Sequence, residues 1–379
     1  MSDYESSEHF AIPEASAADE SGSRTFPCEG CGADLAFDIG VQSLKCPYCG
    51  HVKAIEIDDS AVVAEQDLYA MLARIAEQRA IGVSDEVELC EIRCTSCGAI
   101  VTFAGTLTST ECAYCGDPLL REDVHDAEHR VPVDGVLPFA VSRESAGGNL
   151  RKWVQSRWFA PNDFKQRGAQ GRFSGVYLPY WTFDSMTFTR YTGQRGEHYY
   201  VTTGTGKNKR RERRTRWYPA SGKFQRFFDD VLVVAGIGLP QKRLYALDPW
   251  PLEGCLPFKP ELLAGFLART YDVELEDGLV IARARMDEAL EVDVRRRIGG
   301  DEQRIHSIDT RYDALTYKHL LLPVWMLAYK YRDKSYQVVV NACTGEVQGD
   351  RPYSWIKITA MVVLGLAVAG VIAWVASHS

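Results

Sequence analysis

The chain has 379 residues, 46 % of them apolar and 25 % charged, with a formal net charge of −8; the composition is ordinary for globular protein, and the length suits two or three folding units. The acidic balance argues against a general nucleic-acid binder, because binding to a phosphate backbone needs a cationic face. Eleven cysteines without a secretory signal indicate metal ligation in a reducing cytosol rather than disulfide bonds.

The first 24 residues form an acidic tail that we expect to be disordered. Residues 1–20 hold six acidic side chains, many serines and alanines, and no apolar run. Such a segment buries too little apolar surface to fold and does not resemble a signal peptide.

Two copies of a four-cysteine module follow, over residues 25–57 and 83–125. Each copy has the pattern C-x2-C, fourteen residues, C-x2-C, and each cysteine recurs 66 positions later. Four thiolates leave no position open for water, so we expect two closed, structural zinc ribbons, with iron in a rubredoxin-like site as the alternative. The eight expected ligands are Cys28, Cys31, Cys46, Cys49, Cys94, Cys97, Cys112 and Cys115.

Both modules are acidic. The first has two basic and four acidic residues, and the second has two basic and eight acidic residues. Each zinc centre with four thiolates adds about −2 to this charge. We therefore expect the ribbons to repel phosphate and to act as protein-docking modules or rigid spacers.

The linker between the modules, residues 58–82, is predicted to be helical. Asp59 or Ser60 can cap a helix that runs to Arg79, with Val63 and Leu68 on its apolar stripe.

A mixed α+β body is expected over residues 130–354. Repeated strings in it favour two related halves, with chance recurrence of short strings as the alternative. Each half opens on a Gly-x-Leu-Pro-Phe string (135–139 and 254–258), passes through helical sequence, which in the first half is 144–159, and reaches a Leu-Pro-x-Trp string (178–181 and 322–325). A β-rich run follows each Leu-Pro-x-Trp string. Cys255 and Cys343 are isolated there, which favours small core residues over nucleophiles.

One basic run, residues 207–216, is predicted to lie in a long hairpin loop between strands. Contact with anionic lipid is the functional interpretation that we favour, because cations gain about 1 kcal/mol each near such a surface. RNA or DNA is the second functional interpretation. A solvated loop with no function is the most common outcome for a short charge run and stands against both. The seven cations are Lys207, Lys209, Arg210, Arg211, Arg213, Arg214 and Arg216.

No catalytic motif is recognisable, so we expect a protein that is not an enzyme. The glycines at 204 and 206 do not fit a phosphate-binding loop, because Val201 and Asn208 stand where that motif needs other residues. Asp184, Asp229 and Asp230 lie near predicted strands but lack a paired general acid.

The C-terminal segment, residues 355–377, is predicted to be a transmembrane helix. Residues 358–376 carry no charge, and nineteen helical residues reach about 28 Å, close to the hydrocarbon thickness of a bilayer. Arg351 and Lys357 precede the segment, which by the positive-inside rule leaves the body in the cytoplasm. Small residues on one helix face, from Gly365 to Ala376, would allow close pairing with another helix, so a homo-oligomer is one alternative.

The sequence resembles the bacterial TFIIB-type zinc-ribbon membrane proteins, which are often labelled as primosomal protein N′ or helicase-like. The resemblance lies in Cys-Pro-Tyr-Cys-Gly at 46–50, Gly-Val-Tyr-Leu-Pro-Tyr-Trp at 175–181, Phe-Asp-Asp at 228–230 and Leu-Pro-Val-Trp at 322–325. It implies a single-pass protein of the bacterial inner membrane that acts with stomatin/flotillin-like (SPFH) or phage-shock-type proteins. The helicase label does not fit, because the ATPase motifs are absent from the sequence.

These observations favour a membrane-anchored zinc-ribbon adaptor that recruits protein partners and is not an enzyme. The alternative is a membrane-tethered nucleic-acid-binding factor that uses the basic run. An enzyme with an unrecognised site in the body is the third interpretation.

Overall fold

The computed structural model describes most of the chain outside the N-terminal 25 residues. The described ranges are 26–57, 62–81, 90–93, 100–103, 109–111, 118–120, 124–126, 131–162, 173–204, 209–236, 241–331, 334–350 and 352–378. The expected N-terminal tail lies outside them.

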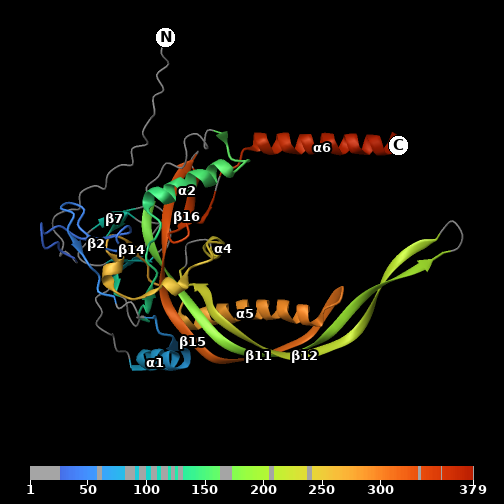
Figure 1. Cartoon of the computed structure of the whole chain (residues 1–379), viewed down its shortest axis with the longest axis horizontal. Coiled ribbons are helices and arrows are strands. Elements are labelled where there is room, and N and C mark those ends of the chain that lie inside the picture. Colours follow the sequence, from blue (N-terminus) through green and yellow to red (C-terminus); the bar gives the residue numbers. More distant parts are fainter. Residues whose placement is uncertain are drawn as a thin grey trace, which may run out of the picture.

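The described chain is mostly β, with several helices (Figure 1). The strands are β1 (Ala36–Asp38), β2 (Ser43–Lys45), β3 (Val52–Lys53), β4 (Gln66–Asp67), β5 (Cys90–Arg93), β6 (Ile100–Phe103), β7 (Ser109–Glu111), β8 (Pro118–Leu120), β9 (Val124–Asp126), β10 (Gly135–Val136), β11 (Phe173–Thr203), β12 (Arg210–Val234), β13 (Leu256–Pro257), β14 (Leu267–Ala268), β15 (Glu302–Tyr331), β16 (Lys334–Asn341) and β17 (Val347–Gly349). The helices are α1 (Leu68–Ile81), α2 (Arg143–Ser156), α4 (Gln241–Tyr245), α5 (Leu275–Ile298) and α6 (Trp355–His378), with 3-10 turns η3 (Leu252–Gly254) and η4 (Pro260–Leu263).

Three very long strands organise the body. β11 pairs antiparallel with β12 along one edge and antiparallel with β15 along the other. β16 pairs antiparallel with β15, and β17 pairs antiparallel with β16. The strands curve away from the body, and the β11–β12 hairpin continues as an arm at the far end (Figure 1).

The two Leu-Pro-x-Trp strings meet at their leucines in the β11–β15 ladder, where Leu178 pairs with Leu322, and they extend in opposite directions from that pair. A short parallel strand pairs with the two residues just before each string: β10 with Leu320 and Leu321, and β14 with Val176 and Tyr177. The string at 254–258, expected to open the second half like 135–139, instead pairs antiparallel with β10 through β13. The strand that corresponds to β10 in the second half is therefore β14: β10 pairs with β15, and β14 pairs in the same parallel way with β11.

Two bulges flank Asp184 where the long strands leave the body. The β11–β12 register shifts between Phe183 and Ser185, and the β11–β15 register shifts between Asp184 and Met186. The partner strands supply the extra residues there, and Asp230 and Ala314 have left-handed φ of 48° and 49°. Because bulges bend and twist a strand, this level turns the sheet toward the arm.

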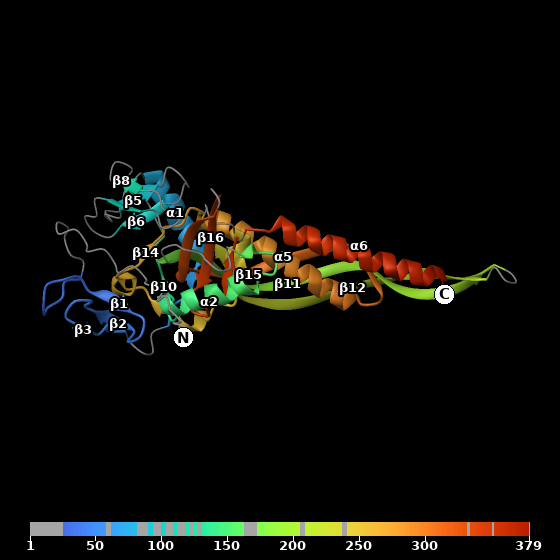
Figure 2. The ribbon, with the colours of Figure 1, turned by 90° about the horizontal axis from the view of Figure 1, so that it is seen from above.

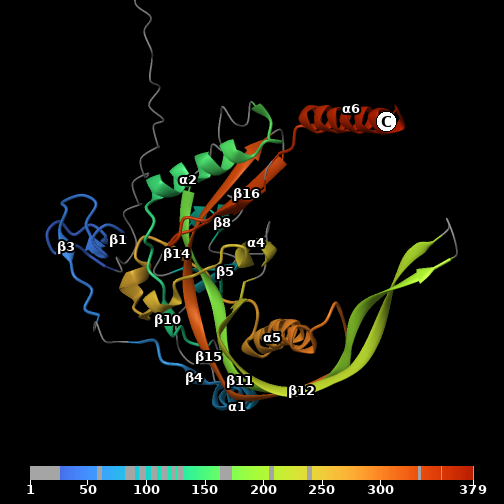
Figure 3. The same ribbon diagram turned by 45° about the vertical axis from the view of Figure 1, so that its right-hand side comes forward.

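Alternation along β11 and β15 divides the core into two faces. Leu178, Tyr180 and Leu322 pack under the segment around α4. The opposite face packs against α2 near Tyr177 and against α5 near Trp181. α5 lies on the concave side of the bend (Figure 3).

The linker helix begins later than the sequence predicted. α1 starts at Leu68, and the Asp67 carboxylate accepts the Ala70 N–H at 2.8 Å as its cap. β4 pairs with Thr316 and Tyr317 of β15 immediately before α1. Strand pairing therefore overrides helix propensity in this stretch, and Val63 joins the core as extended chain.

The basic run was predicted to be a loop, and this is wrong for its main part. Arg210 to Arg216 lie in β12 and pair with Thr203 to Glu197 of β11. Lys209 immediately precedes β12, and Lys207 lies outside the part of the chain that the structure describes.

The C-terminal helix α6 is long and apolar enough to cross a membrane, and none of its apolar stretch is buried against the body. Its first turn is fixed to the chain that follows α2. The Lys357 Nζ donates to the carbonyl of Ala160 at 2.8 Å and to the Asn162 side chain at 2.6 Å, and the Ser354 N–H donates to the Phe159 carbonyl at 2.8 Å. α6 and the β11–β12 hairpin extend in the same direction in two perpendicular views (Figures 1 and 2).

Gly193 tests the close pairing of β11 with β15. A Cβ at Gly193 would collide with the Arg304 carbonyl oxygen of the neighbouring strand, so Gly193→Ala should lower the free energy of unfolding by about 1–3 kcal/mol. Gly148→Ala is the matched control, since nothing lies within 4 Å of its Cβ position in α2; it should raise stability by up to about 1 kcal/mol. Thermal unfolding in mild detergent measures both, and an unchanged Gly193→Ala melt would contradict the described register.

Candidate metal centre

The first four-cysteine module folds as a small sheet with two tight cysteine turns. β1 pairs with β2 and β2 with β3, which brings the two C-x2-C turns together. The Gly32 and Gly50 N–H groups donate to the carbonyls of Cys28 and Cys46, and both glycines have positive φ, 71° and 74°. This left-handed conformation is what each turn requires, and it explains the glycine after each cysteine pair.

The four sulfurs form one cluster. Cys28 and Cys49 Sγ are 3.5 Å apart, as are Cys31 and Cys46 Sγ, and all four lie within 4.8 Å of one another. A tetrahedron with metal–sulfur bonds of about 2.3 Å has sulfur–sulfur edges of about 3.8 Å. The cluster therefore fits a metal ion bound by four thiolates, with Cys28 and Cys46 buried and Cys31 and Cys49 exposed.

The thiols influence one another's ionisation. The backbone N–H of Cys49, ahead of that of Tyr48, lowers the pKa of Cys46 to about 6. The backbone N–H of His51 favours the Cys49 thiolate, but the neighbouring Cys28, Cys31 and Cys46 sulfurs outweigh it and raise the pKa of Cys49 to about 12. Four thiolates this close repel one another, and a dication removes that repulsion.

The ribbon is fixed to the body through one face. The Phe37 side chain enters the core that contains Phe139 and Tyr177, and the Phe37 N–H donates to the Ala264 carbonyl at 2.9 Å. On the rim, the Gln42 side-chain amide donates to the Phe139 carbonyl at 2.9 Å. The expectation of a separate rigid module is therefore refined, because this ribbon shares the core of the body.

A second group of possible metal ligands lies at the bulge level. One carboxylate oxygen from each of Glu65, Asp184 and Asp229 lies within 4.8 Å of the others. Lys318 Nζ is 2.8 Å from Asp230 and 3.6 Å from Glu65, so the group already contains a cation. The buried Asp184 carboxylate accepts the Asp230 N–H at 2.6 Å, which satisfies the backbone of the bulge. We interpret this group as a structural clamp on the linker.

Asp184 holds a proton more strongly than an ordinary carboxyl. Burial raises the pKa of Asp184 to about 7, and the neighbouring Glu65 carboxyl adds to the rise. The pKa of Glu65 is lowered, chiefly by its hydrogen bond with Asp184. The two carboxyls therefore share one proton near neutrality.

The structure confirms the predicted positions of some of the expected metal ligands and leaves others untested. The structure brings together Cys28, Cys31, Cys46 and Cys49 as predicted. The expected ligands of the second module, Cys94, Cys97, Cys112 and Cys115, lie outside the described ranges, so the second ribbon stays a prediction. The Glu65–Asp184 contact joins residues 119 positions apart with no local motif, and the sequence analysis missed it.

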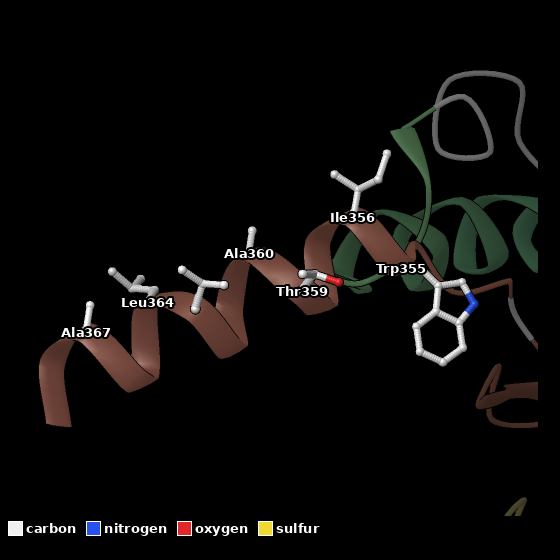
Figure 4. Close-up of a pocket in the computed structure, with 7 residues that line it drawn as sticks. Trp355, Ile356, Thr359, Ala360, Leu364 and Ala367 are labelled. Atoms are coloured by element: carbon white, nitrogen blue, oxygen red, sulfur yellow. The ribbon is translucent and has the colours of Figure 1, made fainter. Parts of the chain in front are cut away.

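One shallow hollow lies on α6 (Figure 4). It is lined by residues of this single helix, among them Trp355, Thr359, Ala360 and Leu364. An open apolar helix face of this kind encloses no ligand.

Comparison with known proteins shows a distant similarity to a bacterial protein. The chain is 26 % identical over 347 residues to a protein of Bacillus subtilis (strain 168) described as "Uncharacterized protein YdjG", and the match covers 89 % of this chain and 92 % of that protein. No protein-family model and no solved structure matches the chain. The similarity extends over most of both chains and assigns no activity.

The shared proton predicts a pH-dependent stability. An unfolded Asp loses its proton near pH 4, whereas folded Asp184 keeps its proton to about pH 7. The folded state thus binds more protons between these values, and stability falls as the pH rises through this window. The lowered pKa of Glu65 makes stability rise with pH, but only at and below the ordinary pKa of a glutamate, near pH 4.

When the pH is raised from about 5 to 8, the Asp184→Asn protein should therefore lose less stability than the wild-type protein. Melting temperatures of the full-length proteins at both pH values measure this, with Asp229→Asn as a control on the exposed side of the same group. Equal pH dependence of the wild-type and Asp184→Asn proteins would contradict the shared proton.

Proposed function

We propose that this protein is a non-enzymatic, membrane-anchored adaptor that presents zinc ribbons to protein partners at the cytoplasmic face of a bacterial inner membrane. Zinc is the preferred metal because the donor set is four thiolates, which zinc takes in closed structural sites. By resemblance, the partners are SPFH/stomatin-like or phage-shock-type proteins.

The observation that carries the proposal is a set of exposed apolar side chains on the docked ribbon. Tyr48 lies between the ligands Cys46 and Cys49 and is 71 % exposed, while Val41 and Val52 are also exposed. Phe37, by contrast, is already covered by the body. The metal thus holds exposed apolar side chains on a rigid base, which suits recognition of a protein surface.

The membrane part of the proposal uses α6. Its 22-residue apolar stretch, Trp355–Ala376, reaches about 33 Å as a helix, close to the hydrocarbon thickness of a bilayer. Lys357 and the exposed Trp355 stand at its first turn, where basic and aromatic residues favour the membrane–water interface. The positive-inside rule then supports a cytoplasmic body.

The acidic ribbon favours a protein partner over nucleic acid. The module has twice as many acidic as basic residues, and the metal centre with its four thiolates adds negative charge. A membrane-tethered nucleic-acid-binding factor is the alternative, and the positive charge of the β11–β12 hairpin is the observation in its favour.

Changing the exposed apolar residues of the ribbon tests the adaptor proposal. We expect tagged full-length protein in mild detergent to retain SPFH-type or phage-shock-type proteins, and Tyr48→Ser with Val52→Ser to lose them, because the docking surface is removed while the cysteines remain. Tyr69→Ser, which changes a 58 % exposed tyrosine on α1, is the matched control and should retain them.

Zinc content is measured on the same samples, so that a folding failure of the ribbon is recognised separately. Partners that stay bound to the Tyr48→Ser, Val52→Ser protein would contradict docking at this surface. Nuclease-resistant nucleic acid in place of these proteins would support the alternative.

A further inference from the structure

The end of the β11–β12 hairpin is a separate cationic surface. β15 begins at Glu302, which pairs with Gly196, so residues 197–203 pair only with residues 210–216 and form a two-stranded arm together with Lys209. This arm holds six Lys or Arg residues against two carboxylates in a chain of net charge −8. Its six cations are all exposed: Lys209, Arg210, Arg211, Arg213, Arg214 and Arg216.

Both faces of the arm are cationic and aromatic. Tyr199 pairs with Arg214 and Tyr200 with Arg213, and successive pairs point to opposite faces. The Arg211 guanidinium lies 4.0 Å from the Tyr200 ring centre, and the Arg216 guanidinium lies 5.0 Å from that of Tyr199. Because cations lie on both faces, the end of the arm can contact anions on all sides, whereas packing on a protein surface would use only one face.

We propose that this arm binds the headgroups of an anionic bilayer as a second membrane contact. Guanidinium groups form paired hydrogen bonds with phosphate oxygens, and tyrosine favours the interface between water and hydrocarbon. A bilayer is favoured over nucleic acid because α6 holds the chain beside one, which raises the local concentration of headgroups. The inference rests on the membrane attachment proposed above.

The direction of the arm sets a condition on this contact. α6 and the hairpin run the same way along the molecule, and the hairpin reaches past the end of α6 in perpendicular views (Figures 1 and 2). Charged side chains are costly at the centre of a bilayer, so the arm cannot cross beside α6. The proposed contact therefore requires the inserted helix to turn relative to the body near Tyr353 and Ser354. This turn would break the hydrogen bonds of Ser354 with Phe159 and of Lys357 with Ala160 and would let the arm rest on the near surface.

Hydroxyl-radical footprinting of the full-length protein in nanodiscs tests the proposal. The probes are discs of phosphatidylcholine alone and discs that also contain phosphatidylglycerol. Tyr200, 55 % exposed, should be oxidised severalfold more slowly in the anionic discs, while Tyr69, 58 % exposed on α1, should not change. Arg211→Gln with Arg213→Gln should remove the protection of Tyr200, because each cation near an anionic surface contributes about fivefold.

Arg151→Gln with Lys152→Gln is the matched control, since it removes two exposed cations from α2 and should leave the protection intact. Equal oxidation of Tyr200 in both discs, or protection that survives Arg211→Gln with Arg213→Gln, would overturn the proposal. Protection of Tyr200 by duplex DNA or by RNA but not by anionic discs would overturn it in favour of nucleic acid. Failure of the chain to co-migrate with the discs would overturn the membrane attachment itself, which separates the two failures.

Discussion

The pairing of β11 with β15 is the constraint on which the rest of the molecule depends. It runs from Phe173 opposite Leu327 to Gly196 opposite Glu302 and gives both helices, α2 and α5, one surface to cover. The short strands β10 and β14 extend the same sheet, and the four-cysteine ribbon docks beside them. A shift of this register by one residue would turn the apolar side chains of both strands to the wrong faces.

The ribbon shows how a metal site and a sheet stabilise one another. A module with β-strands of two or three residues builds only a small core of its own, around Leu35 and Leu44, and metal binding normally supplies the missing free energy. Here Phe37 also reaches the core of the body, where its ring lies 6.4 Å from that of Phe266 with the ring planes tilted by 57°. Loss of the metal would therefore loosen an edge of the body as well as the ribbon.

The sequence predicted the parts of this protein whose signals are local. The cysteine spacing predicted the cluster at Cys28 and Cys49, and the uncharged C-terminal run predicted α6. The long strands were predicted only as short runs, because arginine, glycine and proline interrupt β12, and partner strands rather than propensity keep it extended. The docking of the ribbon and the clamp around Asp184 depend on contacts between distant segments, which no pattern in one segment shows.

X-ray absorption at the zinc edge of the full-length protein shows whether the ribbon holds a closed metal site of four thiolates. Such a site gives a single shell of four sulfurs at about 2.3 Å. Cys46→Ser, which changes a buried ligand, should reduce the zinc bound per chain, while Cys343→Ser, outside the cluster, should not. A shell that contains oxygen or nitrogen in the wild-type protein, or zinc content unchanged by Cys46→Ser, would contradict a closed site of four thiolates.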